Sequence, residues 1–113
     1  MTIEHALAVD AIGINKETGD VHLTISDHLP WGRSHYSLLE AKVNAYLNFA
    51  ESGEIYTTYP DARGRNLVVH LIAKYRPTPE AEMVFSQISE YLVARGLTFV
   101  HTGLPAGYDD DAA

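Results

Sequence analysis

Residues 66–96, NLVVHLIAKYRPTPEAEMVFSQISEYLVARG, decide the fold, because they place the clearest strand of the chain directly before its clearest helix. Residues 66–75 are apolar on both parities, and only His70 and Lys74 interrupt the second parity. A strand that is apolar on both sides is typical of the middle of a sheet whose two faces are covered. The stretch therefore predicts a central strand that leads into a helix.

The helix after this strand has signals at both ends. Thr78 can cap it, Pro79 suits its first position, and Gly96 ends it. Its apolar residues recur every three or four positions, which is typical of a helix lying on a sheet. We expect the helix to reach Arg95 and a last short strand to occupy residues 97–102. The apolar stripe consists of Ala81, Val84, Phe85, Ile88, Tyr91 and Leu92.

Toward the N-terminus, the pattern predicts a β-hairpin. Residues 21–26 alternate strictly between apolar and polar, whereas residues 7–15 are apolar without strict alternation. Residues 16–19 between them have turn chemistry. The two stretches are therefore expected to pair, with one apolar face.

Residues 27–59 predict a loop, a helix and a further strand. The loop carries Trp31, and Ser37 and Glu40 have the spacing of a capping box for a helix over residues 36–52. Residues 54–59 are aromatic and β-branched and are followed by a proline, which favours a strand.

The predicted order is β-β-α-β-β-α-β, an α+β fold with a five-stranded, antiparallel-dominated sheet. Both helices are expected on one face, because each has a single apolar stripe to bury. The last six elements match the ferredoxin-like pattern. In that pattern, however, residues 20–26 would be central, with no room for a hairpin partner, so the strand order stays open. Residues 1–102 are expected to form one domain and residues 103–113 a disordered acidic tail.

The composition excludes several classes of function. The chain of 113 residues has no cysteine, so a disulfide framework and thiolate metal sites are excluded. A net charge of −7 repels phosphate backbones, so we expect no nucleic acid partner. Residues 1–11 match neither a signal peptide nor an anchor, and we expect a cytoplasmic protein with no membrane partner.

One loop collects residues that could carry chemistry. Asp27, His28 and His35, joined by Glu51 from the following helix, could combine a group that titrates near neutrality with an orienting carboxylate, as general acid–base catalysis requires. Two histidines separated by six residues are not a known metal signature, so we assign no metal, no cofactor and no catalytic residue. A small-molecule or metal-dependent enzyme built on these three residues remains the alternative hypothesis.

The sheet face away from the helices is expected to be apolar for a surface in contact with water. Such a face suits self-association, a protein partner or an apolar ligand, unless the tail or the N-terminal segment covers it. Its expected residues are His22, Thr24, Tyr56, Thr58, Val68, His70 and Ile72.

Three segments carry a resemblance to a known family: ISDHLPW at residues 25–31, LEAKVNAYL at residues 39–47 and FAESGEIY at residues 49–56. Over about residues 10–75, the chain resembles a family of small bacterial domains of unknown function. The resemblance implies a bacterial cytosolic protein and brings no established activity.

The leading hypothesis is a protein-binding module of immunity or adaptor type. Some small acidic bacterial domains neutralise toxins, and by this analogy the partner would be a basic protein. Homodimerisation through the sheet face is a separate expectation. The binding residues we expect are Asp27, His28, Trp31, His35, Glu51, Glu54 and Tyr56.

Overall fold

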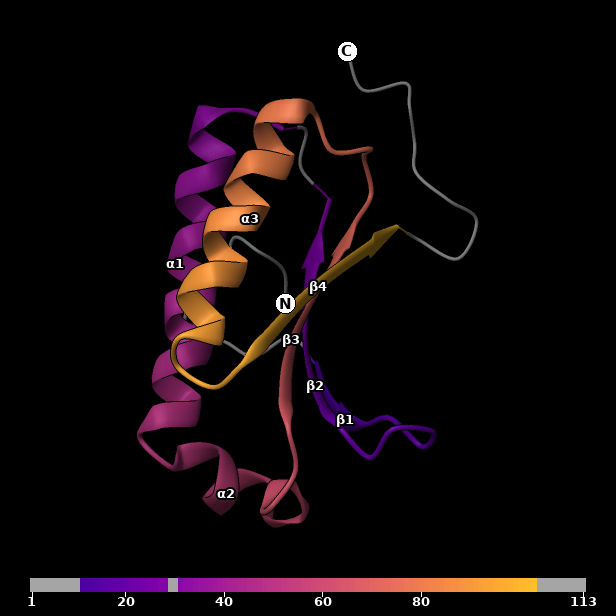
Figure 1. The fold of residues 1–113 in the computed structure, drawn as a ribbon, viewed down its shortest axis with the longest axis vertical. Helices are drawn as coiled ribbons and strands as arrows, with labels where there is room; N and C mark the ends of the chain where they lie inside the picture. Colours follow the sequence, from indigo (N-terminus) through magenta and orange to yellow (C-terminus); the bar gives the residue numbers. More distant parts are fainter. Residues whose placement is uncertain (1–10, 29–30, 104–113) are drawn as a thin grey trace.

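The computed structural model describes residues 11–28 and 31–103, and its fold is α+β. Within these ranges, a four-stranded sheet in the order β1-β2-β3-β4 carries α1 and α3 on one face (Figure 1). The elements are β1 (Ala11–Ile14), β2 (Val21–Asp27), α1 (Arg33–Glu51), α2 (Glu54–Thr58), the 3-10 helix η1 (Pro60–Ala62), β3 (Leu67–Ala73), α3 (Pro79–Val93) and β4 (Thr98–Gly103).

The sheet is mixed, with two parallel pairings out of three. β1 pairs antiparallel with β2, which confirms the predicted hairpin over the part of it that the structure describes. β2 pairs parallel with β3, and β3 pairs parallel with β4. The prediction of a five-stranded, antiparallel-dominated sheet is therefore not confirmed, nor is the ferredoxin-like relation.

The difference has one local cause, the predicted strand at residues 54–59. Gly53 adopts a left-handed conformation with φ of 81°, and the chain then forms the short helix α2, in which only Ile55 is buried. Aromatic and β-branched content favoured a strand there, but the segment has no alternating apolar face to bury. Without this strand, β2, α1 and β3 form a strand–helix–strand unit, and a helical crossover of this kind joins parallel strands. One wrongly predicted strand therefore accounts for the difference between the predicted antiparallel-dominated sheet and the mixed sheet of the structure.

The two long helices begin in different ways. α3 starts as predicted: the backbone N–H of Ala81 donates to the Thr78 side-chain oxygen at 3.1 Å, and Pro79 occupies the first turn. α1 begins at Arg33, before the predicted capping box, and its N-cap residue Gly32 makes no side-chain cap bond. Ser37 therefore lies inside the helix, so the predicted cap at this residue is wrong.

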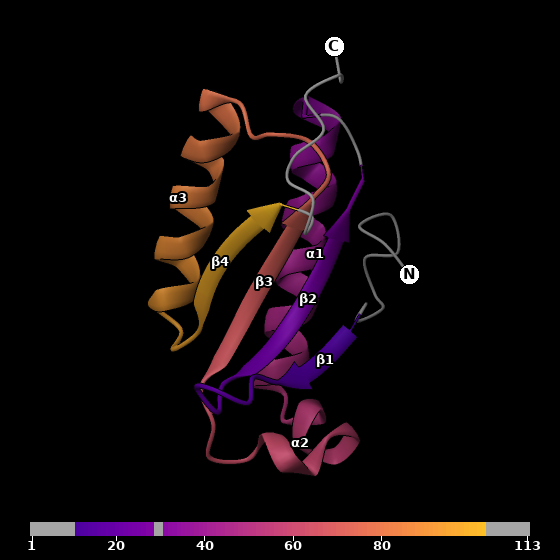
Figure 2. The same cartoon turned by 90° about the vertical axis from the view of Figure 1, so that its right-hand side faces the viewer.

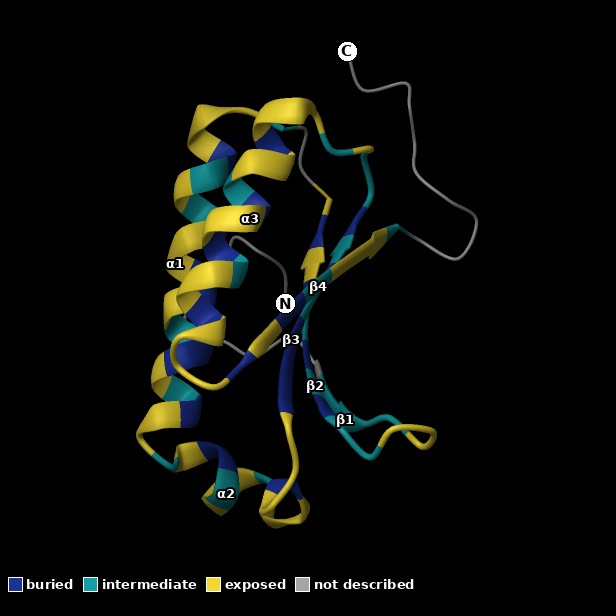
Figure 3. Cartoon of the chain, viewed as in Figure 1, coloured by how far each residue is buried: buried dark blue, intermediate teal, exposed yellow. Residues whose placement is uncertain are grey.

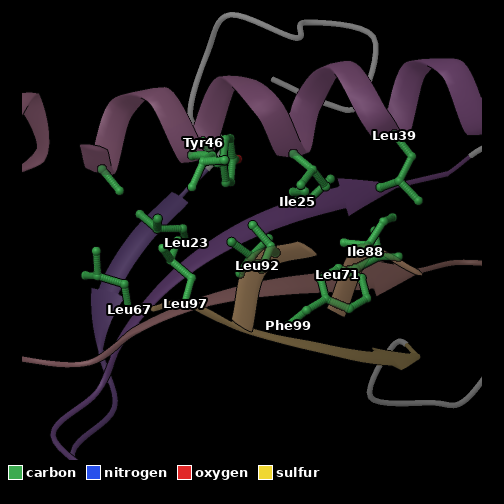
Figure 4. Packing of buried hydrophobic residues seen from close by; sticks show 14 of the residues in the cluster. Leu23, Ile25, Leu39, Tyr46, Leu67, Leu71, Ile88, Leu92, Leu97 and Phe99 are labelled. Carbon is green, nitrogen blue, oxygen red and sulfur yellow. The ribbon is translucent and has the colours of Figure 1, made fainter. Parts of the chain in front are cut away.

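The core lies between the helices and one face of the sheet (Figures 3 and 4). Val21, Leu23 and Ile25 alternate inward and are fully buried, as the strict alternation predicted. Tyr46 of α1 is also fully buried, and its hydroxyl donates to the backbone oxygen of Thr24 at 2.6 Å. Burial of each such apolar side chain contributes about 1.5–3 kcal/mol to folding, and the Tyr46 bond fixes α1 against β2.

The other face of the sheet is covered by none of the described helices (Figure 2). We call the outward-facing side of β2, β3 and β4 the open face. Tyr56 and Thr58 were predicted to lie on it and do not, because they belong to α2. Its residues are His22, Thr24, Ser26, Val68, His70, Ile72, Thr98, Val100 and Thr102. Among the described helices, none is long and apolar enough to cross a membrane.

Candidate functional site

The carboxyl ends of the parallel strands lie side by side at one edge of the sheet. Asp27 at the end of β2 pairs with Ala73 of β3, and Ala73 pairs with Gly103 of β4. In open sheets with parallel strands, ligands bind in the crevice outside this edge. Four of the predicted binding residues, Asp27, His28, Trp31 and His35, lie at or next to this edge.

Asp27 and His35 form a buried pair. The alternation that buries Ile25 also turns Asp27 toward the helices, and His35 faces it from the first turn of α1. His35 Nε2 and Asp27 Oδ2 are hydrogen-bonded, and the two residues are only 3% and 4% exposed. Polar groups at such depth require partners, and the pair therefore ties the end of β2 to the start of α1.

Trp31 lies over this pair. Its indole stacks on the imidazole of His35, with ring centroids 4.2 Å apart and 14° between the planes. The indole and the ring of Phe85 from α3 form a T-shaped contact with centroids 5.2 Å apart, and Nε1 donates to the backbone oxygen of Tyr75 at 3.0 Å. Trp31 thus connects α1, α3 and the segment after β3.

The geometry of this cluster favours a structural role. A general base must come within hydrogen-bond reach of its substrate, whereas His35 is almost fully buried beneath Trp31. His28 is exposed. Over residues 11–28 and 31–103, no group of three or more histidine, cysteine, aspartate and glutamate side chains could hold a metal ion.

The other three predicted binding residues lie far from this cluster. From His35 to Glu51 at the end of α1 is about 24 Å along the helix axis, at about 1.5 Å per residue. Glu51 Oε1 lies 3.5 Å from Nη1 of Arg95, and the guanidinium of Arg63 lies 5.3 Å from the ring of Tyr56. Glu54 is exposed in the first turn of α2. The seven residues therefore do not form one site.

A second cluster lies on the open face. Nδ1 of His22 on β2 and Nδ1 of His70 on β3 are 3.4 Å apart, and the ring centroids are 5.4 Å apart with 72° between the planes. Nε2 of His70 lies 2.8 Å from the hydroxyl oxygen of Thr102 on β4. Burial and, to a lesser degree, the charge of His22 lower the pKa of His70.

Sequence reasoning placed both histidines on this face but did not pair them. The parallel register sets His22 beside Val68 and Thr24 beside His70, so the two imidazoles are diagonal neighbours. Their contact depends on that register, and the sequence left the strand order open. Two histidines in outward positions of strands that turn out to be adjacent would have been the signal.

The open face also lacks fixed charge. Within the three described strands that form it, no outward-facing residue is Asp, Glu, Lys or Arg. The residues are β-branched, hydroxyl-bearing or imidazole side chains, and Val68 is 6% exposed although no described helix covers it. The excess of acidic residues therefore lies elsewhere on the molecule.

These features define the chain as an α+β protein with a mixed four-stranded sheet, a buried Asp–His pair at one edge and an open face whose described strands present no Asp, Glu, Lys or Arg. The chain belongs to a family of unknown function (DUF6572), whose sequence model matches residues 1–104. The expectation of a family of unknown function is thereby confirmed. No curated protein and no solved structure matches the chain.

Proposed function

We propose that the protein is a protein-binding module that docks through its open face, and that the occupant of this face is a second copy of the chain. The observation that carries the proposal is the absence of Asp, Glu, Lys and Arg from the outward positions of three adjacent described strands. Depletion of charge is the compositional mark of the fully buried part of a protein–protein interface.

Net charge supports a second copy on this face. Two chains that each carry a charge of −7 repel one another, and the repulsion is least where the surfaces in contact carry no charge. A basic partner would instead be attracted to the acidic parts of the surface, which lie outside the open face. The neutral face therefore fits self-association better than it fits a basic ligand.

The size of the face predicts a weak dimer. Strands lie about 4.8 Å apart and rise about 3.3 Å per residue, so strands of seven residues such as β2 and β3 give roughly 300–450 Å² of flat area per copy. Stable interfaces bury about 800 Å² of accessible surface per partner. The contact area thus falls at the low end of the range for protein–protein interfaces. The dimer is therefore expected only at high protein concentration.

Sedimentation velocity tests this proposal over on the order of 10 to 500 μM, where the dissociation constants of weak interfaces fall. The wild type should shift toward a dimer as its concentration rises, and Val100→Glu should remain a monomer. Val93→Glu is the matched control, because Val93 is 61% exposed on α3, away from the open face. A wild type that stays monomeric over the whole range, or a Val93→Glu variant that dissociates equally, would overturn the proposal.

A second candidate function is the binding of a basic protein through the acidic surface, as in an immunity or adaptor protein. The distribution of charge favours it, because the open face contributes none of the excess of acidic residues. Cross-linking mass spectrometry at low and high salt would identify a basic partner attached near Glu51 or Glu54, in near-equal amount to the chain. Attraction of this kind fades with ionic strength, so a partner retained equally at high salt would contradict this candidate.

A further inference from the structure

His22 and His70 are the feature of the open face that self-association leaves unexplained. We propose that their Nδ1 atoms chelate a divalent transition-metal ion, and that zinc is the metal the site fits. The site lies within one copy of the chain and goes beyond the proposed function, because it does not require a dimer. Imidazole nitrogens suit zinc and its neighbours, whereas magnesium and calcium prefer oxygen ligands.

The separation of the two nitrogens fits a shared metal. Two ligand atoms that each lie about 2.0–2.1 Å from a tetrahedral zinc ion are about 3.3–3.4 Å from one another. The two Nδ1 atoms are 3.4 Å apart, which is longer than the usual 2.7–3.2 Å of a hydrogen bond with an N–H donor. The pair is thus spaced as two ligands of one ion.

Thr102 supplies the support that a metal-binding histidine needs. A ligating imidazole normally donates the N–H of its other nitrogen to a neighbouring acceptor, which fixes the tautomer and the orientation of the ring. Nε2 of His70 lies 2.8 Å from the Thr102 hydroxyl oxygen, so a proton on Nε2 leaves the lone pair of Nδ1 directed toward His22. Thr102 is therefore a positioning residue for His70.

The coordination of the metal is incomplete within the described residues, and this limits the expected affinity for zinc. Those residues supply two imidazoles and no third histidine, cysteine, aspartate or glutamate. Two of four tetrahedral positions are thus left for water or a small ligand, as in sites with open coordination. We therefore expect reversible zinc binding, weaker than at a closed structural site.

The test is a titration of the untagged full chain with ZnCl2, followed by calorimetry and by nitrogen-15 NMR of the imidazoles. The wild type should bind zinc, with the Nδ1 resonances of His22 and His70 shifting and the His70 proton remaining on Nε2. His22→Gln and His70→Gln should each weaken binding by more than the roughly tenfold to hundredfold effect of losing an outer partner. Thr102→Val, with both ligands intact, should weaken it within that range and change the His70 tautomer distribution.

His101→Gln is the matched control, because His101 is an exposed histidine of β4 whose ring contacts Phe85 on the helix side of the sheet. It should bind zinc as the wild type does. Absence of wild-type binding at millimolar zinc would overturn the proposal. Equal loss in His101→Gln, or zinc shifts confined to other histidines, would overturn it as well. A wild type that binds zinc but stays monomeric over the whole concentration range would overturn only the proposed function.

Discussion

Trp31 stacks on His35 at a centroid distance of 4.2 Å, and His35 in turn bonds to Asp27 at the end of β2. The indole contacts His35 at the start of α1, and His35 bonds to the end of β2. The indole also donates to Tyr75 after β3, so these contacts join all three segments. Hydrogen bonds inside a protein gain strength from the low local dielectric. Asp27, Trp31 and His35 are therefore expected to contribute substantially to the free energy of unfolding.

Replacement of Trp31 by alanine should destabilise the fold by about 2 kcal/mol, less than the about 3–5 kcal/mol of a fully buried tryptophan, because Trp31 is only partly buried. Trp31→Phe keeps an aromatic ring but loses the hydrogen bond from Nε1 to Tyr75, and should lower the free energy of unfolding by about 1 kcal/mol. Urea unfolding followed by circular dichroism measures both. Equal stability of the alanine variant and the wild type would show that the contacts of the indole do not stabilise the fold.

The Asp27–His35 pair should show strong coupling. His35→Leu removes the imidazole partner of a buried carboxylate and is expected to cost about 3–5 kcal/mol. Because Asp27→Leu breaks the same interaction, the double variant should lose clearly less than the sum of the two single losses. A double-mutant cycle in urea gives the coupling directly. Strict additivity would mean that the hydrogen bond adds nothing.

Tyr46→Phe isolates one hydrogen bond between helix and sheet. It removes the hydroxyl that donates to Thr24 at 2.6 Å and leaves the acceptor without this donor, at an expected cost of about 1–3 kcal/mol. Tyr91→Phe is the matched control, since Tyr91 is 42% exposed, and it should be nearly neutral. A similar change in both variants would assign the effect to the loss of any hydroxyl rather than to this bond.

The exposure of Tyr91 also shows where periodicity fails as a guide. Its spacing placed it in the apolar stripe of α3, and Ala81, Phe85, Ile88 and Leu92 are indeed buried. Tyr91 lies at the margin of this stripe, next to Leu92 in the sequence. At the margin, a small rotation of the helix about its axis determines whether a side chain is buried or exposed. Periodicity therefore predicted the helix and the centre of its buried face but not the edge of that face.

Local patterns predicted those features that local chemistry controls. The Thr78 cap and the central strand β3 follow from neighbouring residues alone. The helix α3 ends at Val93, two residues before the predicted end at Arg95, and Gly96 has a left-handed φ of 85°. Asp27 and His35 were grouped because they flank one loop, and the structure brings them together. The contact between His22 and His70 joins residues 48 positions apart, and only the parallel register of β2 and β3 creates it.

The last prediction concerns acid and His70. Its folded-state pKa is lowered below the ordinary 6.5, first by burial and second by His22 on β2, whereas its β4 neighbours Val100 and Thr102 carry no charge. Between pH 6.5 and the lower folded-state pKa, His70 is protonated in the unfolded chain but neutral in the folded protein. Lowering the pH through this interval therefore favours unfolding. Stability attributable to His70 is thus present above this value and is lost as the pH falls toward the folded-state pKa.

Urea midpoints measured at about pH 7.5 and about pH 5.5 should therefore differ less in His70→Gln than in the wild type. His28→Gln is the control, because His28 is exposed and lies at the end of β2 outside the open face, and it should keep the wild-type difference. Zinc should enlarge the wild-type difference, since it binds the neutral imidazole of the folded state and is released on protonation. An unchanged pH dependence in His70→Gln would mean that the proton uptake that favours unfolding occurs at other groups.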